Sequence, residues 1–340
     1  MSTETIPTAE HLTQLLGCGR VTSVTVDSTR DTIVSRIVRL RLAYDGPSDG
    51  PTSLLMKTAH PTRNNDGGGR QEIAFYNHVA PAMPAGMVPR CFEAQRDDTT
   101  GAWHILLEDL ADTHVVATVW PIPPNTAQCE AIVDAWARFH ALGWDNPQLN
   151  VSIGTVPDEA AHEGFLRDLA ERFARFVDLL GDRLTTERRQ RFERLLAEGS
   201  RLLGRARRPN HLTLVHRDAH VWNCFLPRDG GSDVRIFDWD SWRIGIATSD
   251  LAYMMATHWY PERRRRLEVG LLDRYHAALL AHGVTTYDRA MLAEDYRWSA
   301  LWQITTPIWQ ATYDIPPLIW WSHHERTMAA FEDLGCADFL

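Results

Sequence analysis

Apolar and polar positions alternate along the first part of the chain, and this period of two is typical of half-buried strands. Loops rich in glycine and proline separate the alternating runs, which predict strands within residues 21–29, 32–44, 52–59 and 103–110. One helix is predicted from Arg70 to about Val79, because three glycines precede it and Pro81 ends it. The first part of the chain therefore predicts a small antiparallel sheet with one main helix.

After about Leu110 the apolar residues recur with the helical period. Asn125 stands where an N-cap is needed, and amphipathic helices are predicted within residues 123–142, 163–180 and 188–203. The fold class predicted from this change of pattern is α+β, with two lobes. They are a sheet-based N-terminal lobe at residues 1–108, a hinge at 109–115 and a larger, mostly helical lobe at 116–340.

Composition and charge narrow the class of protein. The chain has 340 residues, of which 44% are hydrophobic and 23% charged, as in an ordinary globular protein. No apolar run approaches the roughly 18 residues of a membrane span, and the five scattered cysteines form no CxxC pair, so we expect a cytoplasmic protein without membrane contact. The net charge of -9 disfavours nucleic acid as a partner. The basic run at residues 262–266 is expected to be a solvated helix face after Pro261.

The stretch LVHRDAHVWNCFL, residues 214–226, encloses a polar loop between two apolar segments. Loops fixed at both ends in this way often carry chemistry. A second stretch, at residues 234–250, begins as a strand and then presents Asp238, Asp240 and Asp250. Carboxylate and amide oxygens are the protein ligands that Mg²⁺ prefers, so Asp238 and Asn223 are candidate metal ligands. Asp218 is the candidate base.

These two stretches resemble a known family. The pattern HxDxxxxN in HRDAHVWN, an Asp after a hydrophobic strand in IFDWD, and a further Asp in SDLA are similar to the catalytic core of the aminoglycoside phosphotransferase and choline kinase group. That group has the protein-kinase-like fold. The sequence of residues 238–255 most resembles that of the branch containing ecdysteroid-kinase-like and uncharacterised bacterial phosphotransferases. The resemblance covers residues 21–255.

The resemblance implies a role for each residue that matches the motif. Asp218 would accept or orient the proton of a substrate hydroxyl, while Asn223 and Asp238 would hold Mg²⁺ against the phosphates of ATP. The resemblance implies that His216, His220 and Asp250 support the structure of the site. Arg217 departs from the glycine that is common at its position in small-molecule members of the family.

In the first lobe the resemblance implies a nucleotide site. Lys57 on a strand and Glu72 on the following helix match the family's pair of a phosphate-binding lysine and its partner carboxylate. The phosphate-covering turn is expected within residues 26–34, which contain no glycine, so Ser28 and Thr29 are expected to contact phosphate instead. Adenine would bind main-chain groups near Glu108 and Leu110.

The acceptor is expected to be a small hydroxylated molecule, because only eleven residues separate Asp238 from Asp250 and leave no room for a peptide platform. The C-terminal region interleaves tryptophans with Asp295, Asp314 and Glu325, which suggests an amine-bearing acceptor such as an aminoglycoside, amino alcohol or amino sugar. Candidate acceptor-binding residues are Asp240, Trp298, Trp302 and Asp314. The helical spacing of Trp298, Trp302 and Trp309 fits a helix core equally well.

Several alternatives stay open at this point. A neutral sugar, a macrolide or a steroid alcohol would also fit as the acceptor, and the sequence does not choose between ATP and GTP or between a monomer and a homodimer. A different class of enzyme, a zinc hydrolase, could use His216 and His220 as ligands, although a third ligand in a comparable motif is missing. A binding module without catalysis is the remaining alternative.

Overall fold

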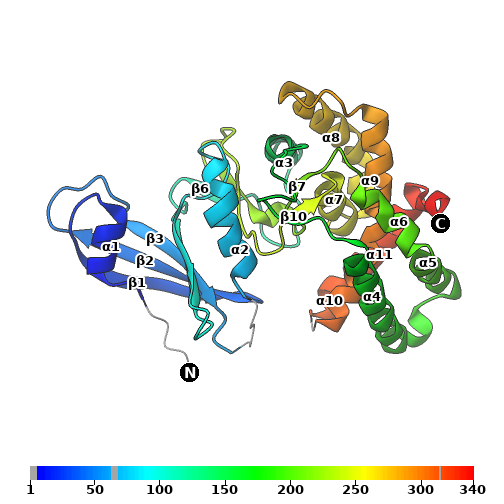
Figure 1. Cartoon of the computed structure of the whole chain (residues 1–340), viewed down its shortest axis with the longest axis horizontal. Coiled ribbons are helices and arrows are strands. Elements are labelled where there is room, and N and C mark those ends of the chain that lie inside the picture. The colour runs from blue at the N-terminus through cyan, green and yellow to red at the C-terminus, as the bar shows by residue number, and fades with distance from the viewer. Residues whose placement is uncertain (1–5, 63–67, 314) are drawn as a thin grey trace. The chain divides into compact units, whose positions relative to one another are not determined.

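The computed structural model describes residues 6–62, 68–313 and 315–340. The chain forms two compact units (Figure 1). Unit 1 is Met1–Ala117 together with Cys224–Trp242, and unit 2 is Thr118–Asn223 together with Arg243–Leu340. The chain therefore returns to its first unit directly after the HRDAHVWN loop, which the local hydrophobic pattern does not reveal. Within the described ranges, no helix is both long and apolar enough to cross a membrane.

Unit 1 is built on a five-stranded antiparallel sheet with the order β1-β2-β3-β5-β4. Its strands are β1 (Val21–Asp31), β2 (Ser35–Tyr44), β3 (Ser53–Ala59), β4 (Cys91–Arg96) and β5 (Trp103–Glu108). Alternate residues of the central strands enter the core, where Val38, Leu40, Leu54 and Met56 are fully or almost fully buried. The predicted strands are thus confirmed, whereas β4, whose sequence CFEAQR alternates weakly, was missed.

Helices and a smaller sheet complete unit 1. Helix α1 (Ala9–Leu16), which the sequence analysis did not predict, packs Leu12 into the core of the sheet. Helix α2 (Arg70–Ala74) continues as a π-helical turn (Phe75–Val79), so the predicted helix from Arg70 to Val79 is confirmed. A second antiparallel sheet has the order β6-β8-β9 and consists of β6 (His114–Val116), β8 (Cys224–Pro227) and β9 (Arg235–Ile236).

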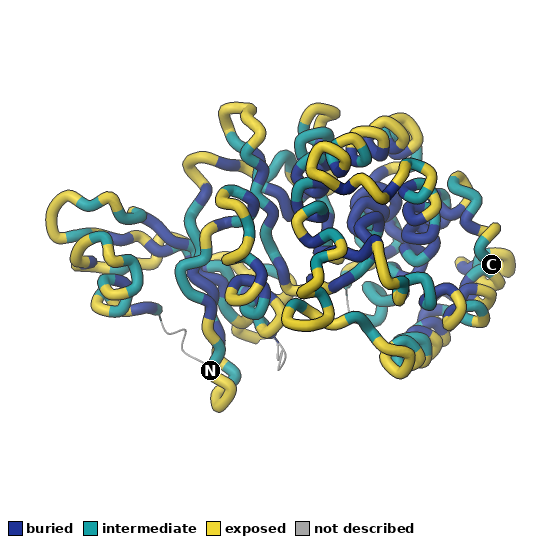
Figure 2. The backbone as a smooth tube through the Cα atoms, turned by 45° about the horizontal axis from the view of Figure 1, so that its top comes forward, coloured by how far each residue is buried: buried dark blue, intermediate teal, exposed yellow. Residues whose placement is uncertain are grey.

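Unit 2 is mostly helical, as predicted. Its helices are α3 (Thr126–Gly143), α4 (Glu159–Leu180), α5 (Thr186–Ala197), α6 (Gly199–Gly204), α7 (Thr248–Ala252), α8 (Pro261–Ala281), α9 (Arg289–Gln303), α10 (Thr306–Thr312) and α11 (Pro317–Asp333). Asn125 caps α3 through a capping box with Gln128, which confirms the predicted helix start. Buried positions follow the inner sides of these helices and exposed positions their outer sides (Figure 2).

Two short strands, β7 (Thr213–Val215) and β10 (Arg243–Gly245), form an antiparallel pair within unit 2. They place the start of the HRDAHVWN loop beside the segment that leads into α7. The basic run at the start of α8 is only partly the solvated face that we expected. Arg265 and Arg266 are exposed, but Arg264 is buried and pairs with Glu268 and Asp333, because its helix face packs inward.

Candidate active site

Asp250 fixes the backbone of the HRDAHVWN loop in unit 2. This aspartate lies on α7 and is fully buried. Its Oδ2 accepts a hydrogen bond from the backbone amide of His216 (2.7 Å), and its Oδ1 accepts one from the amide of Arg217 (2.8 Å). The ring nitrogen Nε2 of His140 lies 3.2 Å from Oδ2. A carboxylate that accepts several N–H donors is a strong, geometrically specific anchor, so the loop has one defined conformation.

Two side chains orient the carboxylate of Asp218. The Tyr253 hydroxyl donates to Oδ1 (2.8 Å), and the amide nitrogen of Asn223 donates to Oδ2 (3.1 Å) and to the Asp218 backbone carbonyl (2.9 Å). The Asp218 side chain is one-third exposed, so a substrate can reach it. Tyr253 escaped the sequence analysis, although it lies one helical turn after Asp250, which is the signal that could have identified it.

The two histidines of the loop have different surroundings. His216 is fully buried, and its Nδ1 accepts a hydrogen bond from the backbone amide of Asp218 (3.2 Å). His220 Nε2 lies 3.6 Å from Asp218 Oδ2, and its ring packs against that of His258. Across the described ranges, no group of three or more His, Cys, Asp or Glu side chains has an arrangement that could hold a metal ion. The geometry therefore gives the zinc hydrolase hypothesis no third ligand.

Unit 1 contains a buried ion-pair cluster around Lys57. The Lys57 ammonium, on β3, donates to Glu72 Oε2 on α2 (2.6 Å) and to Asp238 Oδ1 in the segment after β9. Burial disfavours the charge on Lys57, but the carboxylates of Glu72, Asp238 and Asp240 outweigh that effect and raise the pKa of the lysine. Burial also raises the pKa of the Glu72 carboxyl, and Lys57 opposes this shift. The lysine is thus held protonated and in one position.

Lys57 is the only lysine in the chain, since the other cationic side chains among the 35 Lys and Arg residues are arginines. The two residue types are not interchangeable at a buried site. An ammonium group is a compact charge on a flexible stem, whereas a guanidinium is a planar fork. The chain thus has its one lysine at the position where a compact cation sits between two carboxylates.

Aromatic packing and side-chain hydrogen bonds hold the segment that carries Asp238 against α2. Asp238 has a positive φ of 71°, an uncommon conformation for a residue other than glycine. The next residue, Trp239, stacks on Phe75 with ring centroids 3.9 Å apart. Gln71 and Trp242 exchange hydrogen bonds, because each side chain donates to the other's backbone carbonyl at 2.7 Å. Such a strained backbone persists only where its surroundings determine it, so Asp238 is a fixed group.

The oxygen atoms of Asn223 and Asp238 suit Mg²⁺ chemically. The Asn223 nitrogen is engaged by Asp218, which leaves the amide oxygen as the group available to a cation. The Asp238 side chain is about one-third exposed and carries a carboxylate, the group that supplies most protein ligands to this ion. Asn223 belongs to unit 2 and Asp238 to unit 1.

The other expected nucleotide contacts lie as follows. Ser28 and Thr29 are exposed residues of β1, and the turn to β2 comes later, at residues 32–34. The backbone amide of Glu108 donates to the Arg90 carbonyl, and its side chain accepts from Arg235 (2.9 Å). The Leu110 carbonyl accepts from the amide of His114 (2.8 Å), and no described residue accepts from the Leu110 amide.

The expected acceptor residues are dispersed. Trp298 and Trp302 line a cavity of about 470 Å³ in unit 2, whereas Asp240 lies in unit 1 beside Lys57. Asp314 lies outside the described residues. The cavity also contains Arg217 and Arg243, which the sequence analysis did not propose as binding residues.

Two of the acidic residues that suggested an amine-bearing acceptor, Asp295 and Glu325, pair with arginines of the protein. Asp295 is fully buried and accepts hydrogen bonds from Arg205, Arg208 and the Tyr287 hydroxyl. Arg208 and the other donors hold the pKa of Asp295 below its usual value despite burial. Glu325 forms a two-pronged ion pair with Arg188, at 2.7 and 2.9 Å. Both carboxylates thus have arginine counter-charges within the protein.

Comparisons with known proteins agree with this geometry. The model of the ecdysteroid kinase-like family matches residues 29–284. Among solved structures, a candidate aminoglycoside phosphotransferase from Ralstonia eutropha JMP134 is 14% identical, with 96% of each chain covered and a TM-score of 0.60. The GDP complex of a mutant aminoglycoside 2'-phosphotransferase of type IIIa is 10% identical, again with 96% of each chain covered, and has a TM-score of 0.51. A search of the curated proteins found no match.

The family match and the two-unit fold define a small-molecule kinase, a phosphotransferase of the protein-kinase-like fold that uses an alcohol group as acceptor. More narrowly, the chain belongs to the ecdysteroid kinase-like family, whose model spans well over half of its length.

Proposed function

We propose that the protein transfers the γ-phosphate of ATP to a hydroxyl group of a small molecule, with Asp218 as the catalytic residue. The observation that carries this proposal is the carboxylate of Asp218, which Tyr253 and Asn223 orient within a loop anchored by Asp250. Phosphoryl transfer depends mainly on positioning and charge neutralisation, and a fixed, accessible carboxylate provides the positioning for the attacking hydroxyl.

At the nucleotide, Lys57 contacts the phosphates and Glu72 keeps the lysine in place. The support for this role is the short, buried Lys57–Glu72 ion pair. The base of the nucleotide binds the main chain at Glu108 and Leu110, where the Leu110 amide is available as a donor. Ser28 and Thr29, on β1 before the turn to β2, contact phosphate.

Asn223 and Asp238 hold Mg²⁺ when the nucleotide is bound. Bound there, the ion would supply the positive charge that neutralises the phosphates. Asp218 orients the substrate hydroxyl and accepts its proton as the oxygen attacks phosphorus. His216 and His220 support the loop and take no direct part in the transfer.

The acceptor is a hydroxylated small molecule. An aminoglycoside, amino alcohol or amino sugar is disfavoured, because the described residues that line the unit 2 cavity include arginines and no carboxylate. The other candidate class is a neutral sugar, macrolide or steroid alcohol. The tryptophans of the cavity favour this class.

The unique lysine offers a direct test of nucleotide binding. An ATP analogue with an acyl phosphate at its γ-position acylates an amine that lies against the terminal phosphate, and the protein has one lysine amine. We expect peptide mass spectrometry to find the label on Lys57, ATP in excess to block it, and Lys57→Arg to abolish it. Repeating the labelling with an excess of GTP in place of ATP shows which of the two nucleotides protects Lys57 better. A label confined to the N-terminal amine, unaffected by ATP, would reject the nucleotide site.

Turnover is tested by ADP release with Mg²⁺ across aminoglycosides, amino alcohols, hexosamines, macrolides, steroid alcohols and hydroxylated acids. The wild-type protein should release ADP in an acceptor-dependent manner. Asp218→Asn should retain nucleotide labelling at Lys57 and lose acceptor-dependent release. Release that persists in Asp218→Asn would remove Asp218 from the mechanism.

A further inference from the structure

A cavity of about 470 Å³ in unit 2 is lined by two neighbours of Asp218, Arg217 and Tyr253. Tyr253 connects the cavity to Asp218, because its ring lines the cavity and its hydroxyl donates to Asp218 Oδ1 (2.8 Å). Arg217, the residue before Asp218, lines the cavity as well. The volume is in the range of small-molecule sites, so the cavity is large enough for an acceptor beside the loop that carries Asp218.

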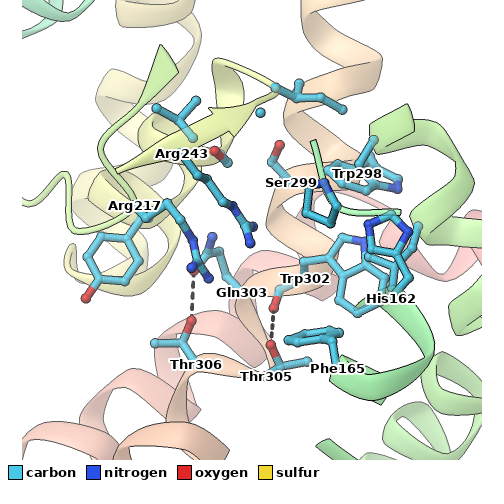
Figure 3. Close-up of a pocket in the computed structure, with 18 of the residues that line it drawn as sticks. His162, Phe165, Arg217, Arg243, Trp298, Ser299, Trp302, Gln303, Thr305 and Thr306 are labelled. Carbon is cyan, nitrogen blue, oxygen red and sulfur yellow. Dashed lines mark hydrogen bonds between the residues drawn. The ribbon is translucent and has the colours of Figure 1, made fainter. Parts of the chain in front are cut away.

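Aromatic residues form one side of this cavity and arginines the other (Figure 3). Phe165 packs against Trp302 and stacks on Trp309, with ring centroids 6.0 and 5.8 Å apart. The indole nitrogen of Trp298 donates to the Leu202 carbonyl (3.2 Å), which fixes that ring in the wall. Such a wall suits the apolar body of a ligand.

The guanidinium groups of Arg217 and Arg243 lie near each other and project into the cavity (Figure 3). Both residues line the cavity and keep more than a third of their surface exposed, although the surrounding protein removes part of the water around each guanidinium. Burial and the charge of Arg217 lower the pKa of Arg243 to about 9, and burial lowers the pKa of Arg217. Two cations that repel each other in a partly desolvated pocket are costly, and an anion between them would relieve that cost.

Counter-charges for these arginines are scarce among the described residues. Neither guanidinium has an ion pair or a hydrogen bond to a described residue, and none of the residues that line the cavity is Asp or Glu. The charge of Asp250 acts on both arginines, but this carboxylate is already engaged by backbone amides and His140. Elsewhere in unit 2, the buried Arg264 is paired with Glu268 and Asp333.

The other polar groups of the wall add donors and no negative charge. The oxygen of Gln303 accepts from the hydroxyls of Thr306 (2.9 Å) and Thr257 (3.2 Å), which leaves its NH₂ group as a donor. His162 is neutral near pH 7, because burial and the charges of Arg207 and Arg243 lower its pKa.

The backbone at Arg217 gives an independent reason to assign a role to its side chain. Its φ of 71° lies in the left-handed region, where glycine is unstrained and a residue with a Cβ atom is strained. A side chain held at such a position points to a function that offsets the strain. Here the side chain delivers a guanidinium into the cavity next to Asp218.

We infer that the cavity binds an acceptor with an oxyanionic group, a carboxylate or a phosphate, which Arg217 and Arg243 hold while the aromatic wall encloses its apolar body. This inference rests on the proposed kinase function and names the substrate class of the same site. Paired arginines match planar oxyanions through several charge-assisted hydrogen bonds. The hydroxyl of such an acceptor then faces Asp218.

Binding can be tested without turnover, with three small aromatic probes that differ in one group. Benzoate and phenyl phosphate carry an oxyanion, whereas benzamide has the shape of benzoate without its charge. We expect at least one of the two anions to raise the Tm of the wild-type protein and benzamide to leave it unchanged. Arg217→Gly, which removes the guanidinium without straining the backbone, should lose the response, and so should Arg243→Gln. Arg266→Gln, an exposed arginine on α8, is the charge-matched control and should keep it.

Turnover supplies the second measurement. ADP release is compared for hydroxylated acids and phosphate esters and for the matching amides and free alcohols. The wild-type kcat/KM should favour the anion by about tenfold or more, the effect of one charge-assisted hydrogen bond. Arg217→Gly and Arg243→Gln should each reduce this preference by a similar factor, and Arg266→Gln should preserve it.

Two outcomes separate this inference from the proposed function. Acceptor-dependent ADP release that is best with amines or neutral alcohols, or an anion response that survives in both arginine variants, would overturn the oxyanion site alone. Failure of the wild-type protein to label Lys57 with the ATP analogue and to release ADP with any acceptor would overturn the kinase assignment, and this inference with it.

Discussion

Lys57 in unit 1 and the Arg217–Arg243 pair in unit 2 are cationic groups at candidate binding sites, yet the protein compensates their charges differently. Three carboxylates surround Lys57 and raise its pKa, with two of them in direct contact. The arginines have Asp250 nearby, whose oxygens are engaged by backbone amides, and their pKa values are lowered. A cation with its own counter-charges is held in position, whereas a cation that lacks them favours an anionic ligand.

This difference predicts that the free energy of unfolding falls when Lys57 is replaced and rises when Arg217 is replaced. Lys57→Met leaves Glu72 buried without its cationic partner, and breaking a buried ion pair in this way typically costs about 3–5 kcal/mol. Urea denaturation should show a loss of that size in the free energy of unfolding. A second substitution, Glu72→Gln, should recover a large part of it. Arg36→Met, which breaks a more exposed pair with Asp31, is the control and should cost under about 1 kcal/mol. A Lys57→Met variant as stable as the wild type would contradict the comparison.

Asp250 should have the next largest effect, because it is the carboxylate nearest to the arginines. Asp250→Asn places an NH₂ group opposite the backbone N–H of His216 or Arg217 and removes the charge that strengthens both bonds. Hydrogen bonds to charged groups contribute about 1.5–3 kcal/mol, so we expect a loss of about 2 kcal/mol and a lower kcat as the loop moves. Asp273→Asn, in the exposed pair with Arg289, should change stability by less than about 1 kcal/mol. Equal effects of the two substitutions would argue against the anchoring role.

The smallest effect should be a gain. Arg217→Gly removes about 1–2 kcal/mol of left-handed strain, while the added freedom of glycine in the unfolded chain costs about 0.5–1 kcal/mol. The free energy of unfolding should therefore rise by up to about 1.5 kcal/mol in urea denaturation without acceptor. Arg243→Gln, which relieves the repulsion and leaves the backbone unchanged, shows how much of the gain is electrostatic. A clear loss of stability in Arg217→Gly would mean that the side chain serves packing.

Residues that lie within short motifs could be read from the sequence, and residues that depend on packing could not. The HRDAHVWN loop, the strand before Asp238 and the helix that carries Glu72 follow from local patterns of apolar residues and helix stops. Tyr253 and Arg243 reach the site only because α7 and the β7–β10 pair fold back on the loop. No local pattern predicts such contacts.

Charge was the least predictable property. The amine-bearing acceptor was inferred from acidic residues counted along the chain, but Asp295 is neutralised by Arg205 and Arg208, which lie some 90 positions away in sequence. The return of residues 224–242 to unit 1 depends likewise on the pairing of β6 with β8, which is set by tertiary structure. A sequence gives the number of charges, and only the fold shows which of them remain available to a ligand.

The central claim, phosphoryl transfer at Asp218, is tested most directly by following the phosphate itself. The wild-type protein and Asp218→Asn are incubated with Mg²⁺, ATP labelled at the γ-phosphate, and the best acceptor from the screen, and the label in the acceptor is measured by chromatography. We predict that the label appears on the acceptor with the wild type and that its rate falls by about a hundredfold or more in Asp218→Asn, the scale of a general-base contribution. Label that appears only as inorganic phosphate, or that reaches the acceptor equally fast in both proteins, would contradict the account.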